Sequence, residues 1–345
     1  MKLLTKILTY RHTKYLAFGL VMALMPTLAS MGYLRNATII VLGSVLFYAV
    51  VAIGLSVLLG YAGLVSLGTA GFMGLAAYLS AYMTGTLEVP FLLSLVISVL
   101  VPVLIGVLVG LVSLRVSGMY LAIATLAVAE IFIRLFGELS QLTGGFSGMR
   151  ASFPSFFGRT LDRGETFSFI VVVLVAVMIL TDNVLRSATG RALLTMRASE
   201  PAAAAMGINL LKYKLLAFAL ATGYAALAGV LYVHFIQFAF PSDWNLLLAL
   251  QLLAVIVIGG LKSIMGTVLG AFVVFGVPTL WLSRLPIIGD INGLSFIFTG
   301  VLIIVVILFY PQGLSHVGRD VIKGYQRLRK QANRQEAHHG STHRE

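Results

Sequence analysis

The sequence contains no cysteine and only 12 acidic residues among 345 positions. The lack of cysteine excludes disulfides, thiolate metal sites and cysteine nucleophiles. Charged residues make up 10% of the chain, whereas soluble domains carry about 25%. This is too little polar surface for a fold surrounded by water. The chain is therefore expected to lie in a lipid bilayer.

Motifs for nucleotide binding and for common hydrolytic chemistry are also missing. The stretch "GGLKS" (Gly259–Ser263) lacks the spacing of a phosphate-binding loop, so we expect no ATP site in this chain. No H-E-x-x-H or G-x-S-x-G pattern occurs, and the six histidines are scattered or lie in the tail. We therefore expect no catalytic residues, no metal and no cofactor in this chain, and transport as its activity.

What the chain does have is long apolar runs. Hydrophobic residues make up 59% of it, and the mean hydropathy is +1.00. Backbone groups in hydrocarbon must pair internally, and continuous runs of roughly 17–25 residues favour helices. The sequence predicts an all-α membrane protein, a polytopic transmembrane helix bundle of about ten spans, at 15–34, 37–58, 62–84, 91–114, 119–137, 167–183, 215–237, 246–261, 264–283 and 295–311.

The basic residues predict the orientation of these spans. With both termini in the cytoplasm, most of the 24 Lys and Arg residues fall on cytoplasmic segments, as the positive-inside rule requires. The net charge of +12 is then explained by topology and by the anionic inner leaflet rather than by nucleic acid. The first run, ending in "TLAS", is either a signal peptide or a retained helix; its length favours the helix.

One cytoplasmic loop, at about 184–214, contains a short helix compatible with water. Ser199 is a plausible N-cap, an acid and a proline suit the first turn, and glycine suits the position after the last turn. The helix either docks in a groove of a partner protein or is a plain linker. The residues of this helix that we single out are Ser199, Glu200, Pro201, Ala202, Ala203, Met206 and Gly207.

Two spans are rich in glycine, one after Gly60 and one after Gly259. Small residues allow close helix packing, and clustered glycines can also break a helix along a transport pathway. "GLVS" and "GLKS" hint at an internal repeat. Candidate pathway residues in the first span are Gly63, Ser66, Gly68 and Thr69.

Charged residues within a span are rare here. Glu130 and Arg134 are four apart on one helix and can pair. Such residues usually face the bundle interior or a cavity, so this pair is expected either to gate a pathway or to hold helices together. Further along, "TGGFSGM" predicts a glycine-rich outer loop that is either a docking site for an outer partner or a simple cluster of turns. Its candidate residues are Thr143, Gly144, Gly145 and Gly148.

Six stretches in order resemble the permeases of branched-chain amino acid ABC importers, especially the longer of the two permease types. They are "GYAGLVSLGTAGFMGLAAY", "GMYLAIATLAVAEIFIRL", "LTGGFSGM", "GRALLTMRASEPAAAAMGI", "LLAVIVIGGLKSIMGTVLGA" and "FYPQGL", between Gly60 and Leu314. The resemblance implies a coupling role for the short cytoplasmic helix. It also implies a second permease subunit, two cytoplasmic ATPases that bind ATP, and an extracytoplasmic substrate-binding protein.

The resemblance also has limits. Thr69 stands where the family often has His, and Lys262 replaces a family glycine, which leaves the substrate open between branched-chain amino acids and urea or short amides. A secondary transporter is the alternative from another class, although Glu130 is the only clear intramembrane acid. We expect a permease domain at 1–314, a disordered basic tail at 315–345, and a location in the bacterial inner membrane.

Overall fold

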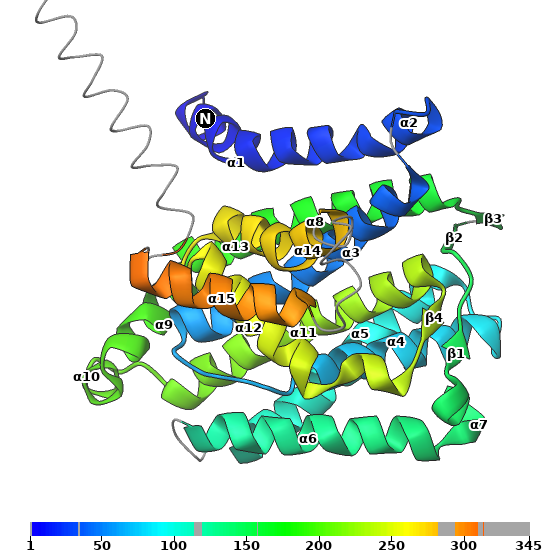
Figure 1. Cartoon of the computed structure of the whole chain (residues 1–345). Coiled ribbons are helices and arrows are strands. Elements are labelled where there is room, and N and C mark those ends of the chain that lie inside the picture. The colour runs from blue at the N-terminus through cyan, green and yellow to red at the C-terminus, as the bar shows by residue number, and fades with distance from the viewer. Residues whose placement is uncertain are drawn as a thin grey trace, which may run out of the picture.

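The computed structural model describes residues 2–33, 35–113, 119–156, 158–281, 294–309 and 313. The expected tail at 315–345 lies outside the described residues. Within them, the chain is a bundle of helices that run between two ends (Figure 1). We call these the α10 end, which carries two short helices, and the strand end, which carries the short β-strands (Figure 1).

The helices are of very unequal length. The six long ones that are apolar enough to cross a membrane lie at His12–Ser30, Asn36–Tyr61, Phe91–Val112, Tyr120–Glu138, Arg163–Arg186 and Leu210–Ile236. The elements of the described chain are α1 (Lys2–Ala23), α2 (Met25–Ser30), α3 (Asn36–Leu55), η1 (Ser56–Tyr61), α4 (Thr69–Gly85), α5 (Phe91–Ser113), α6 (Met119–Glu138), α7 (Ser140–Thr143), η2 (Gly145–Ser147), β1 (Met149–Arg150), β2 (Ser155–Phe156), β3 (Arg159–Thr160), α8 (Arg163–Arg186), α9 (Ala188–Ala198), α10 (Glu200–Ala205), α11 (Leu210–Ile236), β4 (Phe238–Ala239), η3 (Pro241–Trp244), α12 (Leu246–Gly259), α13 (Ile264–Ala271), η4 (Phe272–Gly276), α14 (Val277–Leu280) and α15 (Leu294–Phe309).

The prediction of a polytopic helical membrane protein is confirmed in this coarse form. Each predicted span has a helix at its position, but several of these helices are short. At about 1.5 Å per residue, the 14 residues of α12 reach only about 21 Å, less than the hydrocarbon core of about 30 Å. The number of crossings and the sides of the termini remain predictions.

The centre of the bundle is formed by α3, α4 and α11, which pack on one another closely. Phe47, Phe72 and Phe218 are almost fully buried there. A Cβ at Gly229 on α11 would overlap the backbone carbonyl of Met73 on α4, so only glycine permits this approach. This is the close packing through small residues that membrane helices use in place of a hydrophobic driving force.

The third predicted span differs from the observed helix. Residues 62–68 are not helical, and α4 begins only at Thr69. The break follows a π-helical turn, η1. Gly63, which lies in the break, has φ +73°. The glycine-rich pattern therefore marks a broken helix at this point as well as close packing, because a positive φ suits glycine.

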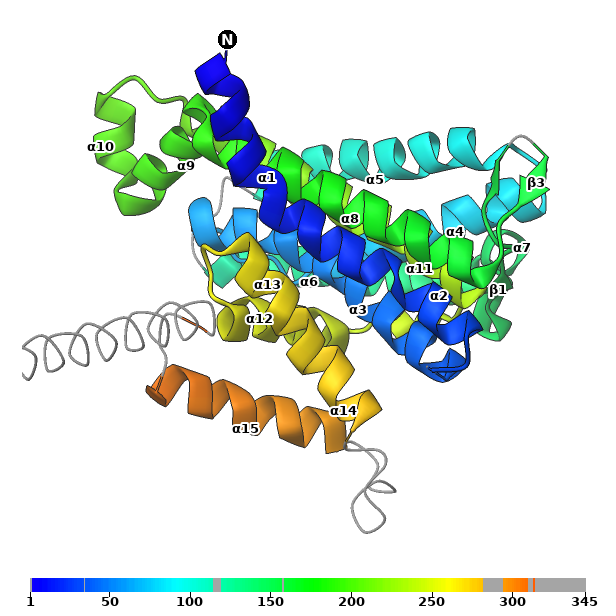
Figure 2. The ribbon, with the colours of Figure 1, turned by 90° about the horizontal axis from the view of Figure 1, so that it is seen from above.

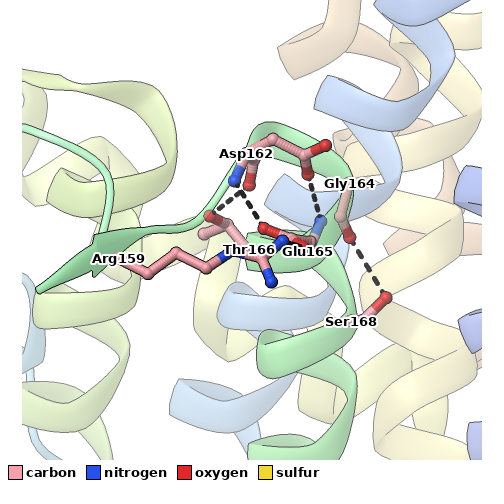
Figure 3. Close-up of polar contacts among 6 residues, drawn as sticks. All are labelled: Arg159, Asp162, Gly164, Glu165, Thr166 and Ser168. Carbon is pink, nitrogen blue, oxygen red and sulfur yellow. Dashed lines mark hydrogen bonds and ion pairs between the residues drawn. The ribbon is translucent and has the colours of Figure 1, made fainter. Parts of the chain in front are cut away.

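The strand end is held together by short pairings rather than by a sheet. Strands β1 and β4 pair antiparallel, with Met149 opposite Ala239, and thus connect the segment after the glycine-rich loop to the end of α11. Nearby, α8 starts with a capping box in which the Asp162 side chain accepts from the Glu165 backbone N–H at 2.6 Å, and the Glu165 carboxylate accepts from the Asp162 N–H at 3.0 Å (Figure 3). Arg159 pairs with the same glutamate. The helix at the predicted span 167–183 therefore begins four residues before that span, at Arg163.

Candidate functional site: the α10 end and the broken helices

The short helices α9 and α10 project as a knob from one end of the bundle (Figure 2). The Ser199 hydroxyl accepts a hydrogen bond from the Ala202 N–H at 3.3 Å, which is the N-cap that the sequence predicts. Gly207 has φ +78° and ends the helix through the Gly207 N–H to Ala204 carbonyl bond at 2.9 Å. We call residues 188–207 the knob.

The exposed residues of α10 around Met206 are small and apolar, whereas α9 exposes Arg191 and Arg197. Met206 is 74% exposed, and Pro201, Ala202, Ala204 and Ala205 are exposed beside it. Ala203 is different: its side chain is fully buried. Within the predicted docking helix, Ala203 therefore packs inward against this chain, and its part in docking stays a prediction.

An ion pair attaches α10 to a long helix. Glu200 Oε1 lies 2.7 Å from Lys214 Nζ on α11. The lysine side chain is only 11% exposed, whereas the glutamate is 46% exposed. Because the partly buried ammonium needs a compensating charge, this pair fixes the orientation of α10 relative to α11.

A second attachment runs from the knob to the broken span. Arg197 Nη1 donates a hydrogen bond to the backbone carbonyl of Gly60, and the Arg197 side chain packs against Gly63. The Tyr61 hydroxyl donates to the Lys262 carbonyl at 3.2 Å. The π-helical turn η1 therefore meets the turn between α12 and α13, and the break that follows it contacts the knob.

The candidate pathway residues lie in and after this break, and three of them are buried. Ser66, Thr69 and Thr222 of α11 line a small cavity. The volume of this cavity is about 10 Å³. That is room for about one water molecule. The Leu67 N–H donates to Thr125 Oγ1 at 3.0 Å, and a Cβ at Gly68 would overlap the Thr125 carbonyl. The break therefore packs closely against α6 in this conformation.

Glu130 and Arg134 are paired on α6, with Nε and Oε1 3.7 Å apart. Their side chains are 53% and 78% exposed respectively. Of the two expected surroundings, the core of this chain's bundle does not apply, because α6 turns Ala129 and Phe132 toward the core, but Arg134 does line a hollow at the surface.

The glycine-rich loop at 143–149 forms a compact turn at the strand end. The buried Thr143 hydroxyl donates to the Phe136 carbonyl at 2.6 Å and accepts from the Gly145 N–H at 3.1 Å. Gly144, Gly145 and Gly148 all have positive φ, between 60° and 76°. The glycines therefore have a conformational reason to be there. A role in docking stays a prediction.

One polar cluster was not predicted from the sequence. His234 of α11 contacts Ser80 Oγ through Nε2 at 2.9 Å and the Ser152 carbonyl through Nδ1 at 2.6 Å, and Ser80 Oγ lies 3.0 Å from Ser94 Oγ. All three side chains are buried and come from three helices. No motif links positions so far apart in sequence. The only available signal was an isolated histidine in an apolar run.

Comparison with known proteins identifies a family and several relatives that the chain resembles. A family model described as the permease component of branched-chain amino acid transport systems matches residues 37–307. The high-affinity branched-chain amino acid transport system permease protein LivM of Escherichia coli K12 is 28% identical over 341 residues, covering 91% of this chain and 77% of the relative. LivM of Salmonella typhimurium is also 28% identical, over 86% of this chain and 73% of its own length.

A third relative matches over a shorter stretch of the chain. A probable branched-chain amino acid transport permease protein LivM of Methanocaldococcus jannaschii is 28% identical over 56% of this chain and 59% of its own length. No solved structure matches the chain. The family match spans well over half of the sequence, so this multi-pass membrane protein belongs to the family of branched-chain amino acid transport system permease components.

Proposed function

We propose that the chain is one permease subunit of an ABC importer in the bacterial inner membrane and passes branched-chain amino acids inward. A second permease subunit, two cytoplasmic ATPases and an extracytoplasmic binding protein complete the transporter. The α10 end is then cytoplasmic. The chain makes no chemical bond; ATP binding and hydrolysis in its partners shift a two-state bundle between its conformations.

The observation that carries this proposal is the knob. Its exposed face is small and apolar around Met206, as suits a helix that enters a groove of a soluble partner. Its inner side is fastened to α11 by Glu200 and Lys214 and to the broken span by Arg197. A linker needs no such attachments, whereas a helix that passes on a partner's movement does.

A pair of Ala→Trp variants tests the proposal. Ala204→Trp places a bulky ring on the exposed face of the knob, and Ala37→Trp places the same ring at the exposed start of α3, at the opposite end. We expect Ala204→Trp to insert in the membrane but to lose at least tenfold in ATPase co-purification and in stimulated ATP hydrolysis. Ala37→Trp should keep both, because aromatic rings are tolerated at membrane interfaces.

Full stimulated hydrolysis and uptake by Ala204→Trp would show that the knob is only a linker. The substrate is tested separately, by uptake of radiolabelled leucine, isoleucine and valine in competition with urea and acetamide. The relatives' names favour the amino acids. Uptake of urea or acetamide without uptake of the amino acids would show that the substrate is urea or a short amide.

A further inference from the structure

The outward face of α6 carries charge within a helix that is long and apolar enough to cross a membrane. Its exposed residues form one stripe along the helix: Tyr120, Ile123, Ala127, Glu130, Ile131, Arg134, Leu135 and Glu138. We call these residues the α6 stripe. Figure 1 shows α6 along the lower edge of the bundle, and no described helix lies beyond it.

The depth of Glu130 makes lipid an unfavourable neighbour for this stripe. At about 1.5 Å per residue, Glu130 lies about 12 Å from the strand end of α6. Arg134 is closer to that end, and its long side chain can reach the headgroups. The short carboxylate cannot, and its pair with Arg134 at 3.7 Å leaves it 53% exposed. Acids within spans face protein or a cavity rather than hydrocarbon.

The exposed face of α5 shows what a lipid-facing surface of the same chain looks like. Its large exposed residues are all aliphatic: Leu92, Leu93, Val96, Leu100, Leu104, Leu108, Leu111 and Val112. No charge interrupts them. The α6 stripe differs because it carries an acid, a base and, one turn from the acid, Ala127, whose small side chain permits close approach of another helix.

A hollow continues the stripe at the strand end. It is lined by Ile133, Arg134, Glu138, Phe146, Pro241 and Ser242, with a volume of about 600 Å³. Phe146, at the tip of the glycine-rich loop, is 79% exposed beside it. An exposed aromatic next to an open hollow of mixed polarity is typical of a protein contact, because such residues anchor interfaces.

We propose that the α6 stripe and this hollow form the contact surface for the second permease subunit. The inference rests on the proposed function, which supplies that subunit. The partner presents a membrane helix with small residues against Ala127 and a neutral hydrogen-bond donor toward Glu130. The ion pair that the sequence suggested as a gate or a brace is thus a brace between subunits.

Photo-crosslinking in the assembled transporter tests this surface. A photoreactive amino acid is placed at Ile131 on the α6 stripe and, as a matched control, at Leu104 on the α5 face. We expect a covalent product that contains the second permease subunit from position 131 and only lipid adducts from position 104. An inter-subunit product from position 104 alone, or a product of two copies of this chain from position 131, overturns the assignment.

Charge removal provides a second readout in the same complex. Glu130→Gln and Arg134→Gln should each lower the amount of second permease subunit retained on purification severalfold. The double variant should retain more, because no unpaired charge is left. If the unmodified chain purifies with no second permease subunit, the proposed function fails. If the complex is intact but position 131 gives no inter-subunit product, only the interface is wrong.

Discussion

Arg197 in the last turn of α9 donates a hydrogen bond to the backbone carbonyl of Gly60, in the π-helical turn that ends the α3 segment. The arginine side chain also contacts Gly63, which lies in the break before α4. The knob is therefore in direct contact with the break, which also contains the buried Ser66 and leads into Thr69 at the start of α4.

Loss of this contact should uncouple the knob from the break without releasing the ATPases. A hydrogen bond from a charged group contributes about 1.5–3 kcal/mol, which corresponds to roughly tenfold or more in a conformational equilibrium. We expect Arg197→Ala to lower uptake about tenfold while ATPase co-purification is kept. Arg191→Ala, which removes the same charge from an exposed position of α9, is the control. Equal uptake by the two variants would contradict the prediction.

The pair of Glu200 and Lys214 should respond unequally to the loss of its two charges. Glu200→Gln leaves a largely buried ammonium uncompensated, whereas Lys214→Met leaves a carboxylate that is already half in water. We expect Glu200→Gln to cost about 1 kcal/mol, the modest value that suits a half-exposed pair. Lys214→Met should cost less, and the double variant should resemble Lys214→Met. Thermal unfolding in detergent measures this order, and equal costs would refute it.

Much of this architecture could be predicted because it depends on local sequence. The cap at Ser199, the helix stop at Gly207 and the positions of the apolar helices follow from nearby residues alone. The late start predicted for α8 was avoidable, because Asp162 and Glu165 have the spacing of a capping box. The glycines indicated that a helix could be broken in this region, but they did not predict that the break lies at 62–68.

The direction in which a membrane helix faces was harder to predict. In water, an apolar stripe marks the buried side of a helix, but lipid and protein core are both apolar, so this signal vanishes. Glu130 and Arg134 therefore pair as predicted while facing away from the core. The burial of Ala203 among exposed alanines depends on how α10 packs on its neighbours, which no local pattern records.

In the buried cluster of His234, Ser80 and Ser94, substitution of the middle residue, Ser80, should destabilise the fold more than substitution of Ser94. Ser80 contacts both other side chains, so Ser80→Ala leaves the His234 Nε2 atom without that partner. An unsatisfied buried polar group costs about 1–3 kcal/mol. Ser94→Ala keeps the contact between Ser80 and His234 and should cost less. A larger drop in melting temperature for Ser94→Ala than for Ser80→Ala would contradict this.

The predicted orientation can be measured directly, because the chain has no cysteine. Positions 147 and 191 are both exposed and lie at opposite ends of the bundle. In intact cells, a membrane-impermeant maleimide should label Ser147→Cys but not Arg191→Cys. Opening the cells should expose the second site. Labelling of position 191 but not of position 147 in intact cells would reverse the predicted orientation and place the knob outside the cell.

The helix stop at Gly207 offers a test in which sterics and backbone conformation are separated. Neither Gly207 nor Gly300 on α15 has any atom within 4 Å of the place where a Cβ would stand, but only Gly207 has a positive φ, of +78°. Valine at position 207 therefore meets free space and an unfavourable backbone conformation, which costs about 1–2 kcal/mol. Asparagine tolerates that conformation much better. We expect Gly207→Val to redirect the end of α10 and lower stimulated ATP hydrolysis severalfold, while Gly207→Asn and Gly300→Val stay near the unmodified chain. If Gly207→Asn falls as far as Gly207→Val, bulk at the partner's surface rather than the helix stop explains the loss.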